Sequence, residues 1–385
     1  MKKVAFLLAI LLMMSILSCA IFAVHAAPAY PTEPDAISCI LMDADTGRVL
    51  YEKNADAALP PASVTKVMTM LLVFEALDSG TLKLTDMITA SANAASMGGS
   101  QIYLKEGETM CVEDLLKSLI VSSANDAAVA LAEAIAGSEM AFVSRMNERA
   151  AELGMVNTHF ENTNGLDDDT DTHLTSARDI AIMSREVLKH ELVFKYSTLW
   201  MDTIRGGEFG LTNTNRLVRF YQGATGLKTG STSKAKFCIS ATAERGGLSL
   251  IAVVMGSPTR DARNALAASL LDFGFANYAH YEDAETALDA VRVQGGVKNA
   301  VGIVKEGFSA TLEKGQEARL EKRMDIPDVL TAPIAEGEKI GTVTYLLDGE
   351  EIGTSDVLAT EAVAKIDFRT LFPRLFAWFL LSEEK

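Results

Sequence analysis

This sequence has few cysteines, few histidines and no excess of basic residues. Its 385 residues include four cysteines and five histidines, and 51 acidic against 35 basic side chains give a net charge of −16. A nucleic-acid partner is not expected, because such proteins need a basic surface. The histidines form no His-Glu-x-x-His pattern, which argues against a zinc peptidase, and we expect neither a metal nor a cofactor.

Three cysteines remain if an N-terminal signal is removed, namely Cys39, Cys111 and Cys238. An odd number at wide spacing is no disulfide framework. At most one pair can form a bridge, and the sequence does not select which. We expect these thiols to act as small buried apolar groups.

The N-terminus has the pattern of an export signal. Two lysines precede an apolar run over 4–23, and Val24-His-Ala26 offers the small residues that a signal peptidase accepts. We expect residues 1–26 to be a signal peptide, cleaved after Ala26 or Ala27, that sends the chain to the outer face of the cytoplasmic membrane or the cell-wall space. The alternatives are an uncleaved anchor helix, since the run approaches spanning length, and lipidation at Cys19.

Alternating strand and helix patterns over residues 30–281 predict an α+β domain. A hairpin over 36–51 is expected to pair with late strands over 236–245 and 248–256 in one antiparallel sheet. Amphipathic periodicity predicts helices over 63–79, 112–136 in two pieces, 138–153, 176–190 and 260–277.

The pattern changes after residue 281. Short alternating strands with glycine punctuation over 284–365 predict a small all-β domain, which we interpret as a spacer. In the tail, 366–385, Arg369 and Arg374 stand among aromatic and apolar residues, which is typical of an amphipathic helix on a membrane surface. The run after Arg374 is too short to span a bilayer. A terminal helix packed on its own domain is the alternative.

Three polar motifs point to chemistry: Ser63-Val-Thr-Lys66, Ser123-Ala-Asn125 and Lys228-Thr-Gly230. Ser63 and Lys66 share one face of a helix that is expected to begin near Ser63, after two prolines. A serine needs a base to attack a carbonyl, and lysine serves only if burial or another cation, such as Lys228, lowers its pKa. The N-terminus of the helix also directs N–H groups toward a developing oxyanion.

The other two motifs each have a purely local alternative. The Ser123 motif interrupts an apolar helical pattern, so Ser123 or Asn125 is also a candidate helix cap. Gly230 on a strand allows another backbone to approach, which suits an edge that binds an extended peptide. The alternative is a glycine-rich turn with a solvated Lys228.

Together these motifs resemble the low-molecular-mass penicillin-binding proteins that are D-alanyl-D-alanine carboxypeptidases. The order and separation agree: 60 residues from Ser63 to Ser123, and 103 from Asn125 to Lys228. Further similar segments lie at 43–51, 59–69, 165–167, 175–180 and 226–232. The resemblance implies a penicillin-binding/β-lactamase-like transpeptidase domain, a small all-β domain and an amphipathic C-terminal helix.

The resemblance also implies a role for each motif residue. Ser63 attacks the carbonyl of the penultimate D-alanine of a peptidoglycan stem peptide, neutral Lys66 takes the hydroxyl proton, and Ser123 relays a proton to the leaving amine. Removal of the terminal D-alanine serves cell-wall maturation, and β-lactams acylate the same serine as inhibitors. The remaining assignments are Asn125 for the substrate amide, Lys228 for positive potential, the N–H groups of Ser63 and Ser231 for the oxyanion, Gly230 within the substrate-binding strand, and Thr229 with Arg263, or its rival Arg260, for the terminal carboxylate.

Three alternatives remain open. A class A β-lactamase shares two of the motifs but needs Ser-Asp-Asn where this chain has Ala124. An endopeptidase that cuts D-alanyl cross-links uses the same residues, and an inactive homologue would only bind wall peptides. Ser231 stands where several carboxypeptidases have histidine, which bears on rate and pH profile rather than on the class of reaction.

Overall fold

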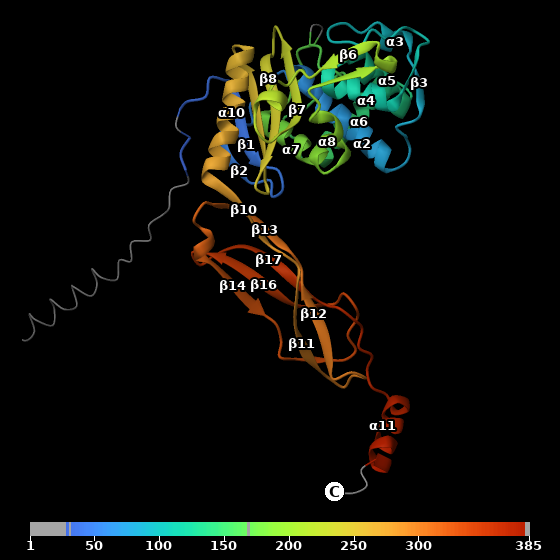
Figure 1. Cartoon of the computed structure of the whole chain (residues 1–385), viewed down its shortest axis with the longest axis vertical. Helices are drawn as coiled ribbons and strands as arrows, with labels where there is room; N and C mark the ends of the chain where they lie inside the picture. Colours follow the sequence, from blue (N-terminus) through green and yellow to red (C-terminus); the bar gives the residue numbers. More distant parts are fainter. Residues whose placement is uncertain (1–27, 31, 168–169, 382–385) are drawn as a thin grey trace, which may run out of the picture. The chain divides into compact units, whose positions relative to one another are not determined.

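The computed structural model describes residues 28–30, 32–167 and 170–381, so the predicted signal peptide lies outside the described residues. Internal contacts divide the chain into residues 1–33 and 34–385, and every element named here belongs to the second unit. A five-stranded antiparallel sheet has the order β2-β1-β9-β8-β7 (Figure 1). Its strands are β1 (Ser38–Asp43), β2 (Val49–Lys53), β7 (Ala224–Thr232), β8 (Lys236–Arg245) and β9 (Leu248–Ser257). The N-terminal hairpin therefore pairs with a late strand, as predicted.

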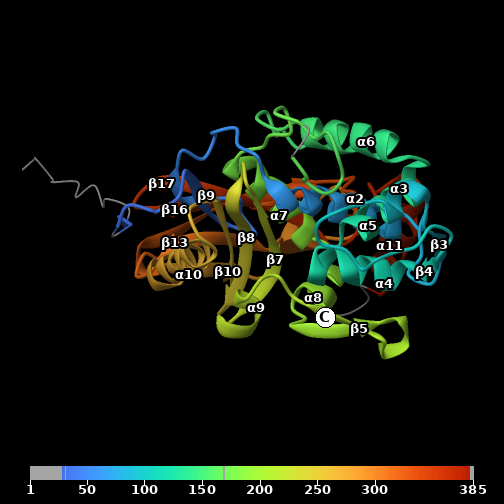
Figure 2. The ribbon, with the colours of Figure 1, turned by 90° about the horizontal axis from the view of Figure 1, so that it is seen from above.

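Helices cover both faces of this sheet (Figures 1 and 2). Strand alternation sends Leu41 and Leu250 toward α10 (Arg260–Asn277), whose Gly274 has room only for a hydrogen where it meets them. The opposite face carries Ile40 and Ile251, which join the large apolar core of the helical region. That region includes α2 (Lys66–Asp78), α4 (Val112–Lys117), α5 (Asn125–Ala136), α6 (Glu139–Glu152), α7 (Ala177–Leu188) and α8 (Leu192–Ser197).

Smaller elements complete the helical region. They are the 3-10 turns η1 (Ala62–Thr65) and η3 (Arg205–Gly207), the π-helix η2 (Ser118–Ser122), the short helices α3 (Ala92–Ala95) and α9 (Leu217–Phe220), and the strand pairs β3 (Met87–Thr89) with β4 (Thr109–Cys111) and β5 (Met201–Ile204) with β6 (Phe209–Thr212). The helix predicted from Ser63 thus starts as a 3-10 turn and becomes α-helical at Lys66. Ser138 and Ser176 cap α6 and α7 by accepting backbone N–H groups.

The C-terminal region is built from strands. β10 (Tyr278–Asp283) pairs with β13 (Phe308–Glu313), and a six-stranded sheet has the order β14-β16-β17-β12-β11-β15. Its members are β11 (Thr286–Gln294), β12 (Ala300–Lys305), β14 (Leu320–Asp325), β15 (Val329–Thr331), β16 (Lys339–Leu347) and β17 (Glu350–Ala359), with the turn η4 (Glu317–Arg319). This region has its own apolar core. β10 crosses the boundary that the sequence predicted between 281 and 284.

The tail forms α11 (Phe368–Leu381), on which Phe368, Leu371, Phe372, Leu375 and Phe376 are exposed. In the described ranges no single helix is long and apolar enough to cross a membrane, and one bent pair, α5 with α6, meets the length and composition criteria together. The three cysteines predicted to remain are free thiols, with Cys39 and Cys238 buried and Cys111 half-buried.

Candidate active site

Ser63 and Lys66 meet at the start of α2, as their spacing predicted. Nζ of Lys66 donates to Ser63 Oγ at 2.9 Å and to the backbone carbonyl of Asn164 at 2.7 Å. The side chain of Lys66 is completely buried, whereas Ser63 is half-buried. The pair therefore presents a hydroxyl to the cleft and keeps the amine away from water.

The surroundings of the two motif lysines favour their neutral forms. Burial lowers the pKa of Lys66 well below its usual range, and the charge of Lys228 lowers it further, while Asp126 opposes the shift. Burial, with a contribution from Arg263, lowers the pKa of Lys228 to about 7. Lys228 is thus the neighbouring cation that the sequence suggested, and burial is the larger cause.

Ser123 follows a π-helix and has a left-handed backbone, with φ 63° and ψ 32°. Its hydroxyl is buried and has no hydrogen-bond partner within the described part of the chain. The residue at the N-cap of α5 is Ala124, and no side chain caps this helix. The capping alternative for Ser123 and Asn125 is therefore wrong. A strained backbone and an unpaired hydroxyl are typical of functional sites.

Asn125 is fixed at one end and open at the other. Its Nδ2 donates to the Gly98 carbonyl at 2.7 Å, and its own N–H donates to the Ser100 carbonyl at 2.7 Å. Oδ1 is buried and accepts no hydrogen bond from the described residues. A Cβ on Gly99, where φ is +73°, would lie 2.9 Å from Nδ2, so the segment around Gly99 packs closely on Asn125.

The Lys228 motif lies on β7, the edge strand of the sheet. A Cβ on Gly230 would lie 2.8 Å from both the Pro61 carbonyl and the Ser63 nitrogen, so glycine allows β7 to pack on the backbone around Ser63. The sequence suggested that Gly230 makes room for another backbone, and the backbone that lies closest to it is that of Pro61 and Ser63 in this chain. The glycine-rich turn with a solvated Lys228 is wrong, because Lys228 is buried within the strand.

Each motif contributes to the lining of one small pocket of about 190 Å³, whereas Lys66, Asn125 and Lys228 themselves are not part of that lining. Thr229 Oγ1 donates to Thr214 Oγ1 at 2.8 Å, and the buried Arg263 donates to the Asn264 side chain and the Cys238 carbonyl. Both Arg263 and its rival Arg260 are at the pocket. Its lining comprises Ser63, Ser100, Ser123, Thr214, Thr229, Gly230, Ser231, Arg260 and Arg263.

The sequence analysis missed several residues of the site. Ser100 and Thr214 line the pocket, and the carbonyl of Asn164 holds Lys66. None of these three residues belongs to a sequence motif that indicates a catalytic role. Ser100 and Asn164 contact the motif residues through their backbone carbonyls. His173 also lies nearby: Nδ1 accepts from the Glu161 N–H, Nε2 bonds to Thr65 Oγ1 at 2.8 Å, and burial lowers its pKa to about 4, so it is a neutral structural residue.

The fold and this pocket place a serine hydroxyl in contact with the amine of a buried lysine, an arrangement suited to acyl transfer on serine. The model of the family described as D-alanyl-D-alanine carboxypeptidase matches residues 23–259, and that of the penicillin-binding protein 5 C-terminal domain matches residues 280–365. The chain belongs to the D-alanyl-D-alanine carboxypeptidase family. This confirms the predicted family and fold class.

Relatives and solved structures agree. The D-alanyl-D-alanine carboxypeptidase DacF of Bacillus subtilis is 43% identical over 348 residues, 88% of this chain and 89% of the relative. Penicillin-binding protein 5 of Haemophilus influenzae superposes with a TM-score of 0.76 at 33% identity, covering 88% of this chain and all of the other. Ampicillin-bound penicillin-binding protein D2 of Listeria monocytogenes has a TM-score of 0.59 at 32% identity, covering 64% of this chain and all of the other.

Proposed function

We propose that the chain removes the terminal D-alanine from peptidoglycan stem peptides through an acyl-enzyme on Ser63, and that β-lactams acylate the same serine. As a member of its family, the chain is a serine-type D-alanyl-D-alanine carboxypeptidase. The observation that carries the residue-level proposal is the 2.9 Å contact between Ser63 Oγ and a buried lysine whose pKa is lowered. Such a lysine is neutral often enough to accept a proton.

Acylation begins when neutral Lys66 accepts the proton of Ser63 and Oγ attacks the carbonyl carbon of the penultimate D-alanine. The N–H groups of Ser63 and Ser231 stabilise the oxyanion. The unpaired Oδ1 of Asn125 accepts the substrate's amide N–H, which supplies the partner that this buried oxygen lacks. The substrate backbone extends along the open edge of β7.

The leaving group departs at the other end of the pocket. The proton passes from Lys66 through Ser123 to the amine of the terminal D-alanine as its bond to the carbonyl breaks. Thr229 and Arg263, with Arg260 at the rim, bind the free carboxylate, and Lys228 adds positive potential. Water then attacks the ester carbonyl, and Ser63 leaves with a proton.

Intact-protein mass spectrometry with a penicillin tests this mechanism. Wild-type protein should form a stable adduct of one penicillin per chain and release D-alanine from an acyl-D-Ala-D-Ala peptide, and Ser63→Ala should do neither. An adduct without release favours an endopeptidase or a binding role. Rapid penicillin turnover indicates a β-lactamase, and a folded protein without an adduct contradicts the mechanism.

The same proposal includes where the enzyme works. The export pattern at residues 1–26 supports a mature chain outside the cytoplasmic membrane, with a catalytic domain over 30–281 and a β domain over 284–365 as a spacer. The exposed apolar residues on α11, among them Phe368 and Phe372, support docking of the tail on the membrane surface. Deletion of 366–385 should abolish cosedimentation with lipid vesicles, and retained binding contradicts this role.

A further inference from the structure

Asp126 is a buried carboxylate next to Asn125 that the proposed mechanism does not use. It is 1% exposed and lies in the first turn of α5. The N–H of Ile102 donates to both carboxylate oxygens at 3.0 and 3.2 Å, and the N–H of Leu104 donates to Oδ2 at 3.0 Å. The N–H of Ala127 donates to Oδ1 at 2.9 Å. Asp126 therefore binds the backbone of a distant segment.

That segment is a wall of the active site. Ser100 lines the catalytic pocket, and its carbonyl accepts the N–H of Asn125 at 2.7 Å. Asn125 and Asp126 thus bind the same short stretch of backbone. The N–H of Asn125 donates to a carbonyl of this stretch, and the carboxylate of Asp126 accepts two of its N–H groups. The wall cannot move without disturbing the start of α5, because both bonds would have to change.

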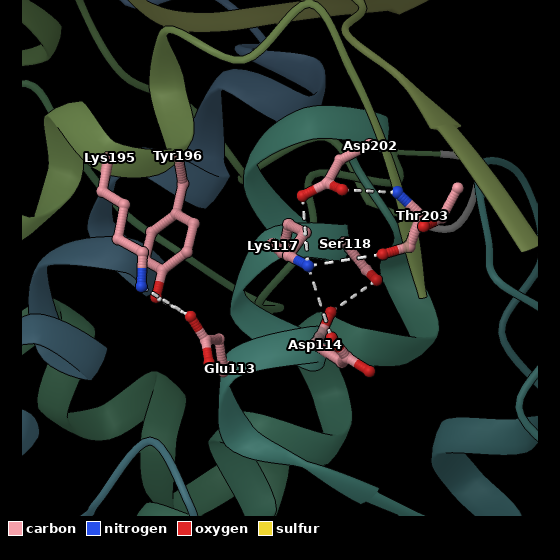
Figure 3. Close-up of polar contacts among 8 residues, drawn as sticks. All are labelled: Glu113, Asp114, Lys117, Ser118, Lys195, Tyr196, Asp202 and Thr203. Carbon is pink, nitrogen blue, oxygen red and sulfur yellow. Dashed lines mark hydrogen bonds and ion pairs between the residues drawn. The ribbon is translucent and has the colours of Figure 1, made fainter. Parts of the chain in front are cut away.

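A second anchor holds the wall from the other side. Arg205 donates to Glu108 at 2.8 Å and to the Ile102 carbonyl at 2.8 Å. The β5–β6 hairpin that carries Arg205 is fixed to α4, because Lys117 pairs with Asp202 at 3.1 Å and donates to the Thr203 carbonyl (Figure 3). α4 leads through the π-helix to Ser123. The wall is therefore clamped between the start of α5, which carries Asn125 and Asp126, and the β5–β6 hairpin, which is fixed to α4.

We propose that Asp126 is a positioning residue that holds the Ser100–Leu104 wall, and through it Asn125, in the geometry that acylation of Ser63 requires. This inference rests on the proposed acylation mechanism. It adds a residue whose role is exerted through its neighbours and not through contact with substrate. Misplacement of a substrate-binding group by about 1 Å costs on the order of 100-fold in rate, so a loosened wall has a measurable effect.

The charge of Asp126 also affects the pKa of Lys66, which gives a second measurable effect of removing it. Besides burial, two charged groups act on the pKa of Lys66: Lys228 on β7 lowers it, and Asp126 on α5 raises it. The nearby His173 is neutral at physiological pH. Removing the negative charge of Asp126 lowers the pKa of Lys66 further. Since Lys66 must be neutral to act as a base, the acid limb of the acylation profile moves to lower pH.

Asp126→Asn is the variant that tests the inference, measured in the purified mature protein. An asparagine offers one acceptor oxygen and turns an N–H₂ group toward backbone donors, so the wall loses at least one hydrogen bond. We expect kcat/KM for an acyl-D-Ala-D-Ala peptide, counted per site titrated with penicillin, to fall about tenfold or more. The acid limb should move to lower pH, because the pKa of Lys66 is no longer raised by the Asp126 charge.

Asp179→Asn is the matched control. Asp179 is also 1% exposed, lies in the first turn of α7, and accepts from the Asn157 N–H at 2.9 Å and the Thr158 hydroxyl at 2.7 Å. Its loss should lower the melting temperature without changing kinetics per active site. Equal kinetic losses in the two variants would overturn the inference, as would Asp126→Asn kinetics within twofold of wild type.

Arg205→Gln keeps the inference testable if Asp126→Asn does not fold. It removes the second anchor of the same wall from a partly exposed site, so kcat/KM should fall severalfold with no shift of the acid limb. Unchanged kinetics in this variant contradict the clamped wall. Absence of a penicillin adduct in the wild-type protein would instead contradict the mechanism on Ser63, which separates the two failures.

Discussion

Buried lysines occur in both regions of the molecule, but their surroundings differ. In the β region, Nζ of Lys305 lies 3.2 Å from the Asp283 carboxylate and donates to the carbonyls of Asp283 and Ala284. In the catalytic region, Nζ of Lys66 contacts one hydroxyl and one carbonyl. No carboxylate forms a salt bridge with Lys66 or Lys228 within the described residues. Burial is common to these lysines, whereas in the part of the chain that the structure describes a carboxylate that balances the charge is present only beside Lys305.

These different surroundings favour a charged carboxylate at Asp283 and a neutral amine at Lys66. Burial alone would raise the pKa of Asp283, but hydrogen bonds from Lys322, Tyr345 and Lys305 outweigh it and lower this pKa to about 2. The carboxyl group of Asp283 is therefore ionised at physiological pH. Lys66, next to another lysine, loses its proton more readily. Lys305 has a carboxylate partner, whereas Lys66, which has none among the described residues, has a lowered pKa, as the base that we propose requires.

Lys66→Met should give the largest effect. It removes the base but keeps an unbranched side chain in the cavity, so the fold should persist. We expect the rate of penicillin acylation to fall about 1,000-fold, within the range that general-base catalysis contributes. Intact-protein mass spectrometry of samples quenched at successive times measures this acylation rate. A variant that acylates within tenfold of wild type would show that another group takes the proton.

The contact between Ser63 and Lys66 could be predicted from sequence because it is encoded locally. Ser63 and Lys66 stand three residues apart on one helical turn, and this short-range geometry survives in the structure. The sequence left Lys228 either on a strand or in a glycine-rich turn, and the structure places it within β7. What the sequence could not supply is the burial that lowers the pKa of both lysines, because burial depends on how β7 packs against η1 and α2.

Lys305 shows the limit of such prediction. Its partners Asp283 and Tyr345 are 22 and 40 residues away, and in the sequence it stands beside a glycine-punctuated turn with no motif. The contacts of Ser100 and Asp126 could not be predicted for the same reason. Backbone groups of the loop over 100–104 bond to Asn125 and Asp126, more than 20 residues away. The sequence identified side chains that do chemistry, and the structure added the groups that hold them.

Lys305→Met should reduce stability and leave catalysis unchanged. It leaves the Asp283 carboxylate without its buried partner, which costs about 3 kcal/mol in the free energy of unfolding. Lys322→Met is the matched control, because Lys322 pairs with the same carboxylate at 2.7 Å but is 39% exposed, so its loss should cost under about 1 kcal/mol. Urea denaturation measures both. Equal costs, or a slower acylation per active site, would contradict the structural role of Lys305.

The smallest effect concerns the pH dependence of Lys228. Its pKa of about 7 means that the charge that Lys228 adds to the potential of the pocket is present below pH 7 and is lost as the pH rises through this value. Between pH 7 and 8 the charged fraction falls from about one half to about one eleventh, so penicillin acylation at low concentration should slow about fivefold. In Lys228→Met, penicillin acylation should be slower than in wild type at pH 6, and its rate should not fall further between pH 7 and 8. A limb that persists in the variant would assign the titration to another group, and a flat wild-type profile up to pH 9 would mean that Lys228 stays charged despite its burial.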